Sequence, residues 1–219
     1  MSAPPTVRAY IGLGANLGDA AATMAAGVAA LDDLADVHVR GVSQLYATAP
    51  WGVTDQPEFR NAVAEIDVVA TSGGAEADAL DLLASLKEIE RSGGRQARAR
   101  WGPRELDLDL LLYGRHRIDV ARSADARSID ADVDPAKAAK RLEVPHRHLR
   151  ERLFVLAPLS DLAPGLVPPG WTETVETRRR VVAAGEPPGN VRVVGAWDPG
   201  PRRWVTAEER PAERSGGAT

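Results

Sequence analysis

The sequence predicts an α+β fold, in which strands and two helices follow each other in the order β-α-β-β-α-β. Two periodicities support this: four short segments are apolar or alternate apolar and polar residues, and two longer ones carry apolar residues at helical spacing. Glycine and proline cluster between these segments, as turns require. The chain has 219 residues, which is enough for one domain with a sizeable core.

The first half of the pattern consists of apolar runs separated by glycine turns. Residues 7–13 form an apolar run that favours a strand, and residues 20–34 show the helical spacing. Residues 37–46 alternate, with a bend expected at Gly41, and residues 61–69 alternate again. These segments predict a strand, a helix and two further strands.

The second half contains a helix and the most informative strand. Residues 75–91 carry leucines at helical spacing, and Gly93 and Gly94 are expected to end that helix. Residues 106–112 alternate leucine with aspartate and predict the last strand. Together the elements predict a ferredoxin-like β-α-β-β-α-β core: an antiparallel sheet with both helices on one face.

Two aspartates project from one side of this last strand. Asp107 and Asp109 are two residues apart, so their Cα atoms lie roughly 7 Å apart on one face. Carboxylates this close repel each other unless a proton or a cation relieves them, and Mg²⁺ is commonly held by one or two carboxylates together with substrate phosphates. A solvated acidic face is the alternative for an isolated Asp-x-Asp. The core side of the strand is expected to hold Leu106, Leu108, Leu110 and Leu112.

A glycine-flanked, arginine-rich stretch precedes the two aspartates. Guanidinium groups suit multidentate phosphate binding, so a metal site beside this stretch suggests chemistry on a nucleoside triphosphate. The arginines are Arg91, Arg95, Arg98, Arg100 and Arg104.

Composition narrows the possible partners. The net charge of −4 argues against a surface built for nucleic acid, so a phosphate site must be local. The chain has no cysteine, which excludes disulfides and thiolate metal sites. It shows neither a signal peptide nor an apolar run long enough for a bilayer, so we expect a cytoplasmic protein without a membrane partner.

The remainder of the chain is less regular. Residues 115–140 contain few large apolar residues and are expected to form a partly mobile excursion. Residues 149–162 predict a helix, and short strands are expected near residues 181–182 and 191–194. Disorder is expected from Glu208 onward.

Five segments, spread over about 150 residues, resemble the 6-hydroxymethyl-7,8-dihydropterin pyrophosphokinase family of the folate pathway. The RWGPR-x-LDLD motif with a VPH downstream is the most specific part of the resemblance. In order, the segments are residues 10–19, 45–61, 90–95, 100–114 and 142–159.

The resemblance implies transfer of the pyrophosphoryl group of ATP to the hydroxymethyl group of the pterin, with release of AMP. It also implies that two Mg²⁺ ions are held by Asp107 and Asp109, and that Arg95 and Arg104 act with them in catalysis. Glu90 matches an acidic position of the family. The ATP ligands implied are Arg95, Arg100, Trp101, Arg104, Arg141, His146 and Arg152.

The pterin site implied by the resemblance lies mostly on the segment between the second and third strands. Asn61 can offer a donor and an acceptor to the ring edge, and Phe59 and Phe154 match the aromatics that sandwich the ring. Family members often have proline where this chain has Ala49. The complete implied set is Thr48, Ala49, Trp51, Phe59, Asn61 and Phe154.

The resemblance also sets expectations for organisation. We expect a pyrophosphokinase domain over residues 1–170 with an insertion at about 122–140, and a carboxyl-terminal extension over residues 171–219 whose last residues are disordered. The partners expected are small-molecule substrates rather than nucleic acid, and the chain is expected to be a monomer.

Two other functions remain open on the residues alone. A nucleotidyltransferase also combines a glycine turn with Asp-x-Asp on a strand, but it would transfer AMP and release pyrophosphate. An RNA-binding module can share this fold, but it would display aromatics on its middle strands within a basic motif, and the open face here carries aspartates.

Overall fold

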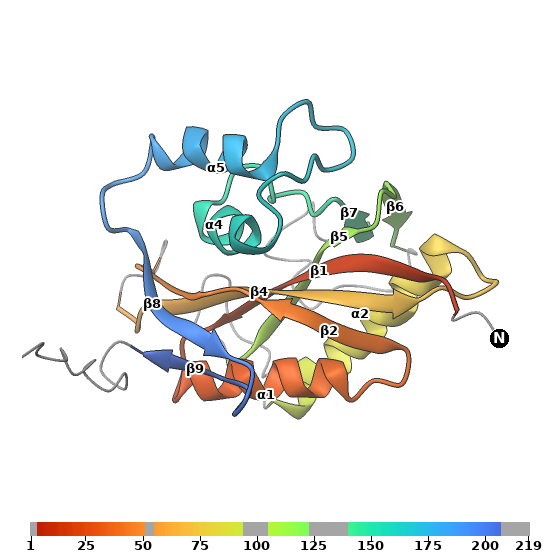
Figure 1. The fold of residues 1–219 in the computed structure, drawn as a ribbon, viewed down its shortest axis with the longest axis horizontal. Helices are drawn as coiled ribbons and strands as arrows, with labels where there is room; N and C mark the ends of the chain where they lie inside the picture. Colours follow the sequence, from red (N-terminus) through yellow and green to blue (C-terminus); the bar gives the residue numbers. More distant parts are fainter. Residues whose placement is uncertain (1–3, 51–54, 94–104, 123–139, 207–219) are drawn as a thin grey trace, which may run out of the picture.

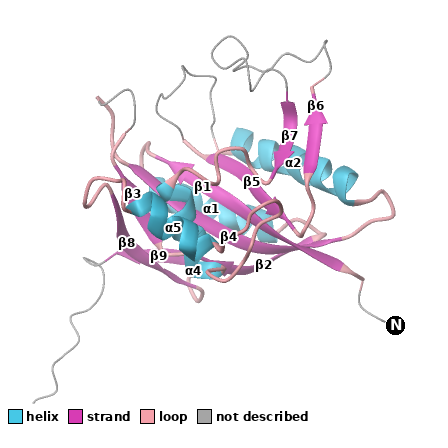
Figure 2. Cartoon of the chain, turned by 90° about the horizontal axis from the view of Figure 1, so that it is seen from above, coloured by secondary structure: helices cyan, strands magenta, loops and turns pink. Residues whose placement is uncertain are grey.

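The computed structural model describes residues 4–50, 55–93, 105–122 and 140–206 (Figure 1). These residues form a seven-stranded antiparallel sheet with helices on both sides and a separate two-stranded sheet (Figure 2). The order in the main sheet is β5-β1-β4-β3-β8-β9, and β2 also pairs with β4. Its strands are β1 (Thr6–Ala15), β2 (Val37–Val42), β3 (Leu45–Thr48), β4 (Phe59–Val69), β5 (Asp107–Tyr113), β8 (Val191–Asp198) and β9 (Arg203–Thr206).

The predicted ferredoxin-like core is confirmed by this strand order and by two helices on one face. These helices are α1 (Ala20–Asp32) and α2 (Ala75–Ser92). The helix α1 begins at Asp19, whose side chain accepts a hydrogen bond from the backbone N of Ala22 at 3.0 Å. Between the helices and the sheet lies the main apolar core, which includes Met24, Leu31, Leu86, Leu106, Leu108 and Leu110.

The prediction that Leu112 lies on the core side of β5 with Leu106, Leu108 and Leu110 is wrong. The pairing of β1 with β5 shifts between Tyr10 and Ile11, so that Ile11 lies opposite Leu110 and Tyr10 lies opposite Leu112. Leu111 is therefore the extra residue of a bulge, and alternation breaks there. Both Leu111 and Leu112 pack in the apolar cluster on the far side of the sheet from α1 and α2.

The segment 37–46, expected as one bent strand, is two strands. β2 and β3 pair with successive parts of β4 and are separated by Ser43 and Gln44. Ser43 interrupts the ladder, because the backbone N of Val63 donates to the Ser43 hydroxyl at 2.9 Å instead of to a backbone carbonyl, while the Ser43 backbone N still donates to the Val63 carbonyl at 2.9 Å. The bend expected at Gly41 is present as a register shift between Val39 and Gly41.

The second face of the sheet is covered by the carboxyl-terminal part of the chain (Figure 1). Helix α4 (Leu153–Leu162) agrees with the helix expected at residues 149–162. It packs on the sheet through an apolar cluster that contains Val63 and Leu111, and α5 (Val175–Ala183) packs against α4.

The strand expected near residues 181–182 is wrong, because these residues lie in α5. Thr174 caps this helix by accepting from the backbone N of Thr177 at 3.1 Å. Glu176 then pairs with Arg179 and Arg180, three and four residues later, as helical spacing allows. These local interactions outweigh the β propensity of two valines.

The prediction of an irregular excursion after residue 114 is also wrong in part. β6 (Ile118–Ala121) and β7 (Lys140–Val144) form an antiparallel pair that runs from Ile118 opposite Val144 to Ala121 opposite Lys140. Few apolar residues suffice here, because Ile118, Leu142 and Val144 are all buried against the main core. Residues 123–139, most of the expected insertion, lie outside the described residues.

The segment expected as an extension shares the main sheet. The predicted strand at residues 191–194 is confirmed as β8, which is longer and pairs with β3. The boundary at residue 170 stays a prediction, and the expected disordered end lies outside the described residues. Within the described ranges, no helix combines the length and the apolar character that crossing a membrane would require.

Candidate active site

Asp107 and Asp109 begin β5 and share one side of it. Leu108, between them, is fully buried in the main core, so the two aspartates project from the opposite face and are partly buried. Their cross-strand neighbours on β1 are glycines: Gly14 lies opposite Asp107, and Gly12 lies opposite Asp109. The carboxylates therefore stand beside a floor without side chains.

This glycine floor continues into a polar row across the sheet. Gly14 is paired with Asp107 on one side and with Asn61 of β4 on the other, and Asn61 is paired with Tyr46 of β3. Residues paired in this way point to the same face, and neighbouring strands are about 4.8 Å apart. Asp107 and Asn61 thus lie on one face at a separation on the order of 10 Å, with only Gly14 between them.

Asn61 is a buried polar residue with a fixed orientation. Its Nδ2 donates to the hydroxyl of Thr48 at 2.9 Å, and both residues are less than 10% exposed. Phe59, partly buried at the start of β4, lies opposite Thr48 in the ladder. The structure therefore brings together three of the residues predicted for the pterin, whereas Ala49 follows β3 and is exposed.

The start of α4 brings Phe154, a fourth residue predicted for the pterin, next to Arg152, which is predicted to bind phosphate. The guanidinium carbon of Arg152 lies 5.7 Å from the centroid of the Phe154 ring, within the range of a cation–π contact. Both residues are partly buried. One predicted residue for each substrate thus occupies the start of the same helix.

The remaining described ATP residues lie on and after β7. The backbone N of His146 donates to the carbonyl of Leu111 at 2.9 Å, which places His146 beside β5 two residues after Asp109. The His146 Nδ1 accepts from the backbone N of His148 at 3.3 Å. Arg141 lies in β7 and is exposed.

Glu90 supports the aspartate strand from the helix side of the sheet. Its carboxylate is 1% exposed and accepts from the backbone N of Leu108 at 2.7 Å and from the amine of Lys87 at 2.7 Å. Lys87 also donates to the carbonyl of Leu108 at 3.2 Å. Glu90 and Lys87 therefore hold the peptide groups on both sides of Leu108, the residue between Asp107 and Asp109. The sequence pattern alone does not reveal this role.

Asn16 is a further residue that sequence reasoning missed. It is 3% exposed, and its Nδ2 donates to the Gln56 side chain at 3.0 Å and to the carbonyl of Pro57 at 3.1 Å. These bonds join the turn after β1 to the segment that leads into Phe59. A pocket of about 410 Å³ beside this junction is lined by Asn16, Gly18, Asp19, Ala20, Ala21, Pro57, Glu58 and Arg60.

Several predicted residues cannot be placed in this geometry. They lie outside the described residues, either between β3 and β4 or in the arginine-rich stretch before β5. They are Trp51, Arg95, Arg100, Trp101 and Arg104.

The two aspartates fit a magnesium site completed by substrate. Among the described residues, no three carboxylate or imidazole side chains converge as they would in a metal cage built from protein alone. Mg²⁺ usually takes one or two carboxylates and leaves its other positions to water and phosphate oxygens. A carboxylate pair above a glycine floor is suited to that arrangement.

Comparison with known proteins agrees with this chemistry. The family model for 7,8-dihydro-6-hydroxymethylpterin-pyrophosphokinase (HPPK) matches residues 10–164. The chain is 40% identical over 186 residues to the 2-amino-4-hydroxy-6-hydroxymethyldihydropteridine pyrophosphokinase of Methylorubrum extorquens, covering 85% of this chain and 98% of that protein. It is 39% identical over 159 residues to the protein of the same name from Pseudomonas aeruginosa, covering 73% and 82% of the two chains.

Solved structures share the fold. A Plasmodium falciparum HPPK-DHPS triple mutant matches with a TM-score of 0.67 at 13% identity, covering 96% of this chain and 50% of that one. The chain thus spans about half the length of this solved protein. From the family match and the sequence relatives, the chain belongs to the 7,8-dihydro-6-hydroxymethylpterin-pyrophosphokinase family.

Proposed function

We propose that the polar row across β5, β1, β4 and β3 is where this chain performs the reaction of its family. The chain is an ATP-dependent diphosphotransferase of folate biosynthesis. It transfers the pyrophosphoryl group of ATP to the hydroxymethyl group of 6-hydroxymethyl-7,8-dihydropterin and releases AMP. The observation that carries the placement is the register that puts Asp107 and Asn61 on one face across Gly14.

At the β5 end of the row, Asp107 and Asp109 would hold two Mg²⁺ ions. Magnesium held there would supply positive charge against the negative charge of the phosphates during transfer. The buried Glu90, paired with the partly exposed Lys87, keeps the Leu108 peptide groups in place, and so fixes the spacing of the two aspartates. Arg152 and His146 would contact the phosphates from the α4 side, together with Arg141 at the edge.

The arginine-rich stretch would complete the phosphate site. Arg95 and Arg104 would follow the migrating negative charge, since guanidinium groups bind phosphate oxygens in a bidentate manner. Arg100 and Trp101 would add contacts to ATP.

At the other end of the row, Asn61 would read the edge of the pterin. The bond from its Nδ2 to Thr48 fixes the amide plane, which presents the carbonyl oxygen in a constant direction. Phe59 and Phe154 would lie on the two faces of the ring, and Ala49 and Trp51 would line the site. A separation on the order of 10 Å leaves room for a flat ring at one end and a triphosphate at the other.

Product identification tests this assignment. Purified protein is mixed with ATP, Mg²⁺ and 6-hydroxymethyl-7,8-dihydropterin, and the products are identified by mass. We expect AMP and a pyrophosphorylated pterin. Pyrophosphate with an adenylylated product would instead support a nucleotidyltransferase.

We further propose that the chain works as a monomer in the cytoplasm without a nucleic-acid partner. Its net charge of −4 and the two aspartates on the sheet face argue against a nucleic-acid partner. Light scattering coupled to gel filtration, with and without added RNA, tests the state of assembly. A dimer, or an RNA complex that survives chelation of metal, would contradict the proposal.

A further inference from the structure

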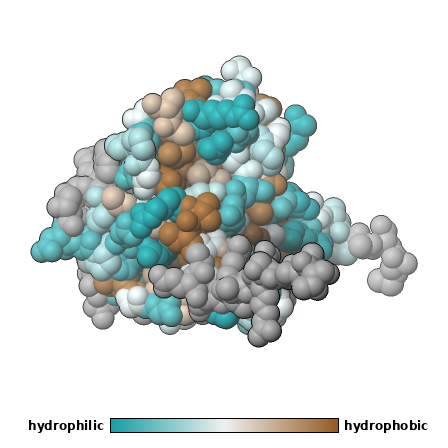
Figure 3. Space-filling model, turned by 60° about the vertical axis from the view of Figure 1, so that its left-hand side comes forward, coloured by the Kyte–Doolittle hydropathy of each residue, from teal (hydrophilic) through white to brown (hydrophobic). Residues whose placement is uncertain are grey.

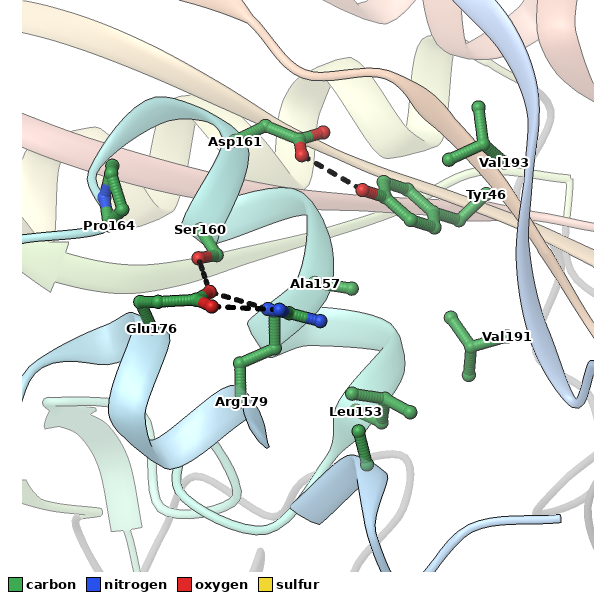
Figure 4. A pocket seen from close by; sticks show the side chains of 11 residues that line it. Tyr46, Leu153, Ala157, Ser160, Asp161, Pro164, Glu176, Arg179, Val191 and Val193 are labelled. Atoms are coloured by element: carbon green, nitrogen blue, oxygen red, sulfur yellow. Dashed lines mark hydrogen bonds and ion pairs between the residues drawn. The ribbon is translucent and has the colours of Figure 1, made fainter. Parts of the chain in front are cut away.

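A hollow separates part of α4 from the sheet next to the polar row. A pocket of about 460 Å³ opens between α4, α5, β3 and β8 (Figure 4). Its apolar wall includes Tyr46, Leu153, Ala157, Val191 and Val193. Tyr46 of β3 packs with Leu153 and Ala157 of α4 in a small buried cluster at the edge of the hollow. Across the hollow itself side chains do not fill the space, so apolar packing there does not set the distance from α4 to β3.

The surface around the hollow is partly apolar. Figure 3, which brings the β8 side of the molecule forward, shows hydrophobic residues between the upper helical layer and the sheet, bordered by hydrophilic ones. Val181 of α5 and Val193 of β8 are each about half exposed. Solvent therefore reaches the space between the two layers.

One carboxylate crosses the gap between α4 and β3. Asp161, near the end of α4, accepts from the Tyr46 hydroxyl at 2.9 Å (Figure 4). Its other oxygen accepts from the backbone N of Gln44 at 3.1 Å. Burial, and then the negative charge of Asp161, raises the pKa of Tyr46 above its ordinary value. The hydroxyl therefore remains a proton donor at neutral pH.

Tyr46 and Asp161, which this hydrogen bond joins, are each connected to one side of the proposed pterin site. Tyr46 lies opposite Asn61 in the ladder and two residues before Thr48. Phe154 lies on the same helix as Asp161, seven residues earlier, which corresponds to about 10 Å along the helix axis. A change in the position of α4 relative to β3 would therefore change the gap between Phe154 and Asn61.

Other contacts hold α4 to the molecule without reaching β3. The Ser160 hydroxyl donates to Glu176 of α5 at 2.8 Å. Leu156 and Leu159 are fully buried in the cluster that contains Val63 and Leu111. The helix should therefore stay folded and docked when the link to Tyr46 is removed.

We propose that Asp161 is a positioning residue for the pterin, which sets the width of the slot between Phe154 and Asn61 through its bonds to Tyr46 and Gln44. This inference rests on the proposed function, because it requires the pterin to lie between those two residues. On the ATP side, Asp107 and Asp109 lie on β5 and His146 is bonded to it, so these residues should not depend on this link. Arg152 lies at the start of α4 and would move with Phe154, so the KM for ATP should change less than the KM for pterin.

Steady-state kinetics of Tyr46→Phe and Asp161→Ala test the proposal, with pterin and ATP varied separately. A hydrogen bond contributes a net 0.5–1.5 kcal/mol, so we expect the KM for pterin to rise about 3- to 10-fold in either variant. The KM for ATP should stay within about twofold of the wild-type value, on the same scale. The double variant should resemble Asp161→Ala alone, because both substitutions remove the same bond.

Ser160→Ala is the matched control. It removes the neighbouring bond from α4 to α5 and leaves the bonds to β3 in place, so the KM for pterin should be unchanged. Asp161→Asn retains one acceptor oxygen and should give an intermediate KM. An equal rise in Ser160→Ala, a parallel rise in the KM for ATP, or an unchanged KM in Tyr46→Phe would each overturn the proposal.

Two further measurements keep the outcomes distinct. Thermal unfolding of each variant shows whether a kinetic change comes from loss of structure, and Tyr46→Phe is the variant least able to disturb folding. Asn61→Ala is assayed in parallel. If Asn61→Ala binds pterin normally, the placement of the pterin is wrong; if Asn61→Ala fails to bind while Tyr46→Phe is normal, only the role of Asp161 is wrong.

Discussion

Two acidic groups on the same face of the sheet have different cross-strand neighbours. Asp67 on β4 lies opposite Arg8 on β1, whose Nε donates to its Oδ1 at 2.5 Å. Asp107 on β5 lies opposite Gly14 on the same strand β1. The cross-strand neighbour of Asp67 is thus an arginine that pairs with it, whereas the cross-strand neighbour of Asp107 is a glycine that leaves space.

The difference extends to the neighbours of each group. Arg8 also pairs with Glu65, and Arg40 donates to the second oxygen of Asp67 at 2.6 Å, which lowers the pKa of Asp67 together with Arg8. Asp109, by contrast, lies opposite Gly12. On one sheet face, the adjacent strand thus places arginine opposite one carboxylate and glycine opposite two others, and the proposed site uses the carboxylates that face glycine.

The largest loss of activity is expected on substitution of Asp107 or Asp109, the two aspartates that lie opposite glycines. Asp107→Ala or Asp109→Ala should lower turnover by at least about 10³-fold, because magnesium supplies several kcal/mol of charge stabilisation. The unfolding temperature should change little, since the leucine core on the other face is untouched. AMP formation and thermal unfolding measure the two effects, and retained turnover would count against the metal assignment.

A smaller effect is expected at the pterin end of the row. Asn61→Ala should weaken pterin binding about 10- to 100-fold, since a buried polar partner is lost at a cost of about 1–3 kcal/mol. Binding of a non-hydrolysable ATP analogue should be unaffected. Isothermal titration with each ligand checks this division, which equal losses for both ligands would contradict.

Asp67, the carboxylate paired with arginines, should affect stability and not catalysis. Asp67→Asn should lower the free energy of unfolding by about 1 kcal/mol at neutral pH and leave catalysis unchanged, since both arginines are about half exposed and water can partly replace the ion pairs. Because the folded-state pKa of Asp67 is lowered, its contribution is present above the ordinary pKa near 4 and is lost as the pH falls through the lowered value.

Denaturant unfolding of wild type and Asp67→Asn at several pH values tests this dependence. The difference between the two proteins should be full at pH 7 and should shrink below about pH 4. A difference that is constant with pH would show that the ion pairs are not its source.

The smallest effect is expected from the glycine floor itself. A Cβ added at Gly14 would lie 3.6 Å from the Asn61 Oδ1, which is ordinary contact. Gly14→Ala should therefore fold normally and raise the KM for pterin only a few fold, on the order of 1 kcal/mol or less. Gly165→Ala provides a control outside the row, because an added Cβ there meets no atom within 4 Å. A complete loss of activity in Gly14→Ala would mean that the floor is tighter than this geometry indicates.

Much of the core could be predicted from alternation and helical spacing. The segments 20–34 and 75–91 are long and periodic, and both are helices. The period of two at Asp107, Leu108 and Asp109 also placed the aspartates on the face away from α1 and α2. These features depend on local sequence, which is why they could be read directly.

The errors came from interactions that a local pattern does not contain. The bulge that turns Leu112 away from the main core depends on the register with β1. The break at Ser43 depends on a bond to β4, and the pairing of β6 with β7 depends on residues separated by 19 to 26 positions. The bonds from Glu90 to Leu108 and from Asp161 to Tyr46 likewise join distant elements, so the local sequence does not reveal them.

The pairing of Ala121 with Lys140 also has a use in protein engineering. The two ends of the intervening segment are held side by side by β6 and β7, and the cost of closing a longer connection grows only with the logarithm of its length. An affinity handle or a fluorescent reporter can therefore be grafted between these ends, with both attachment points anchored on the body of the enzyme.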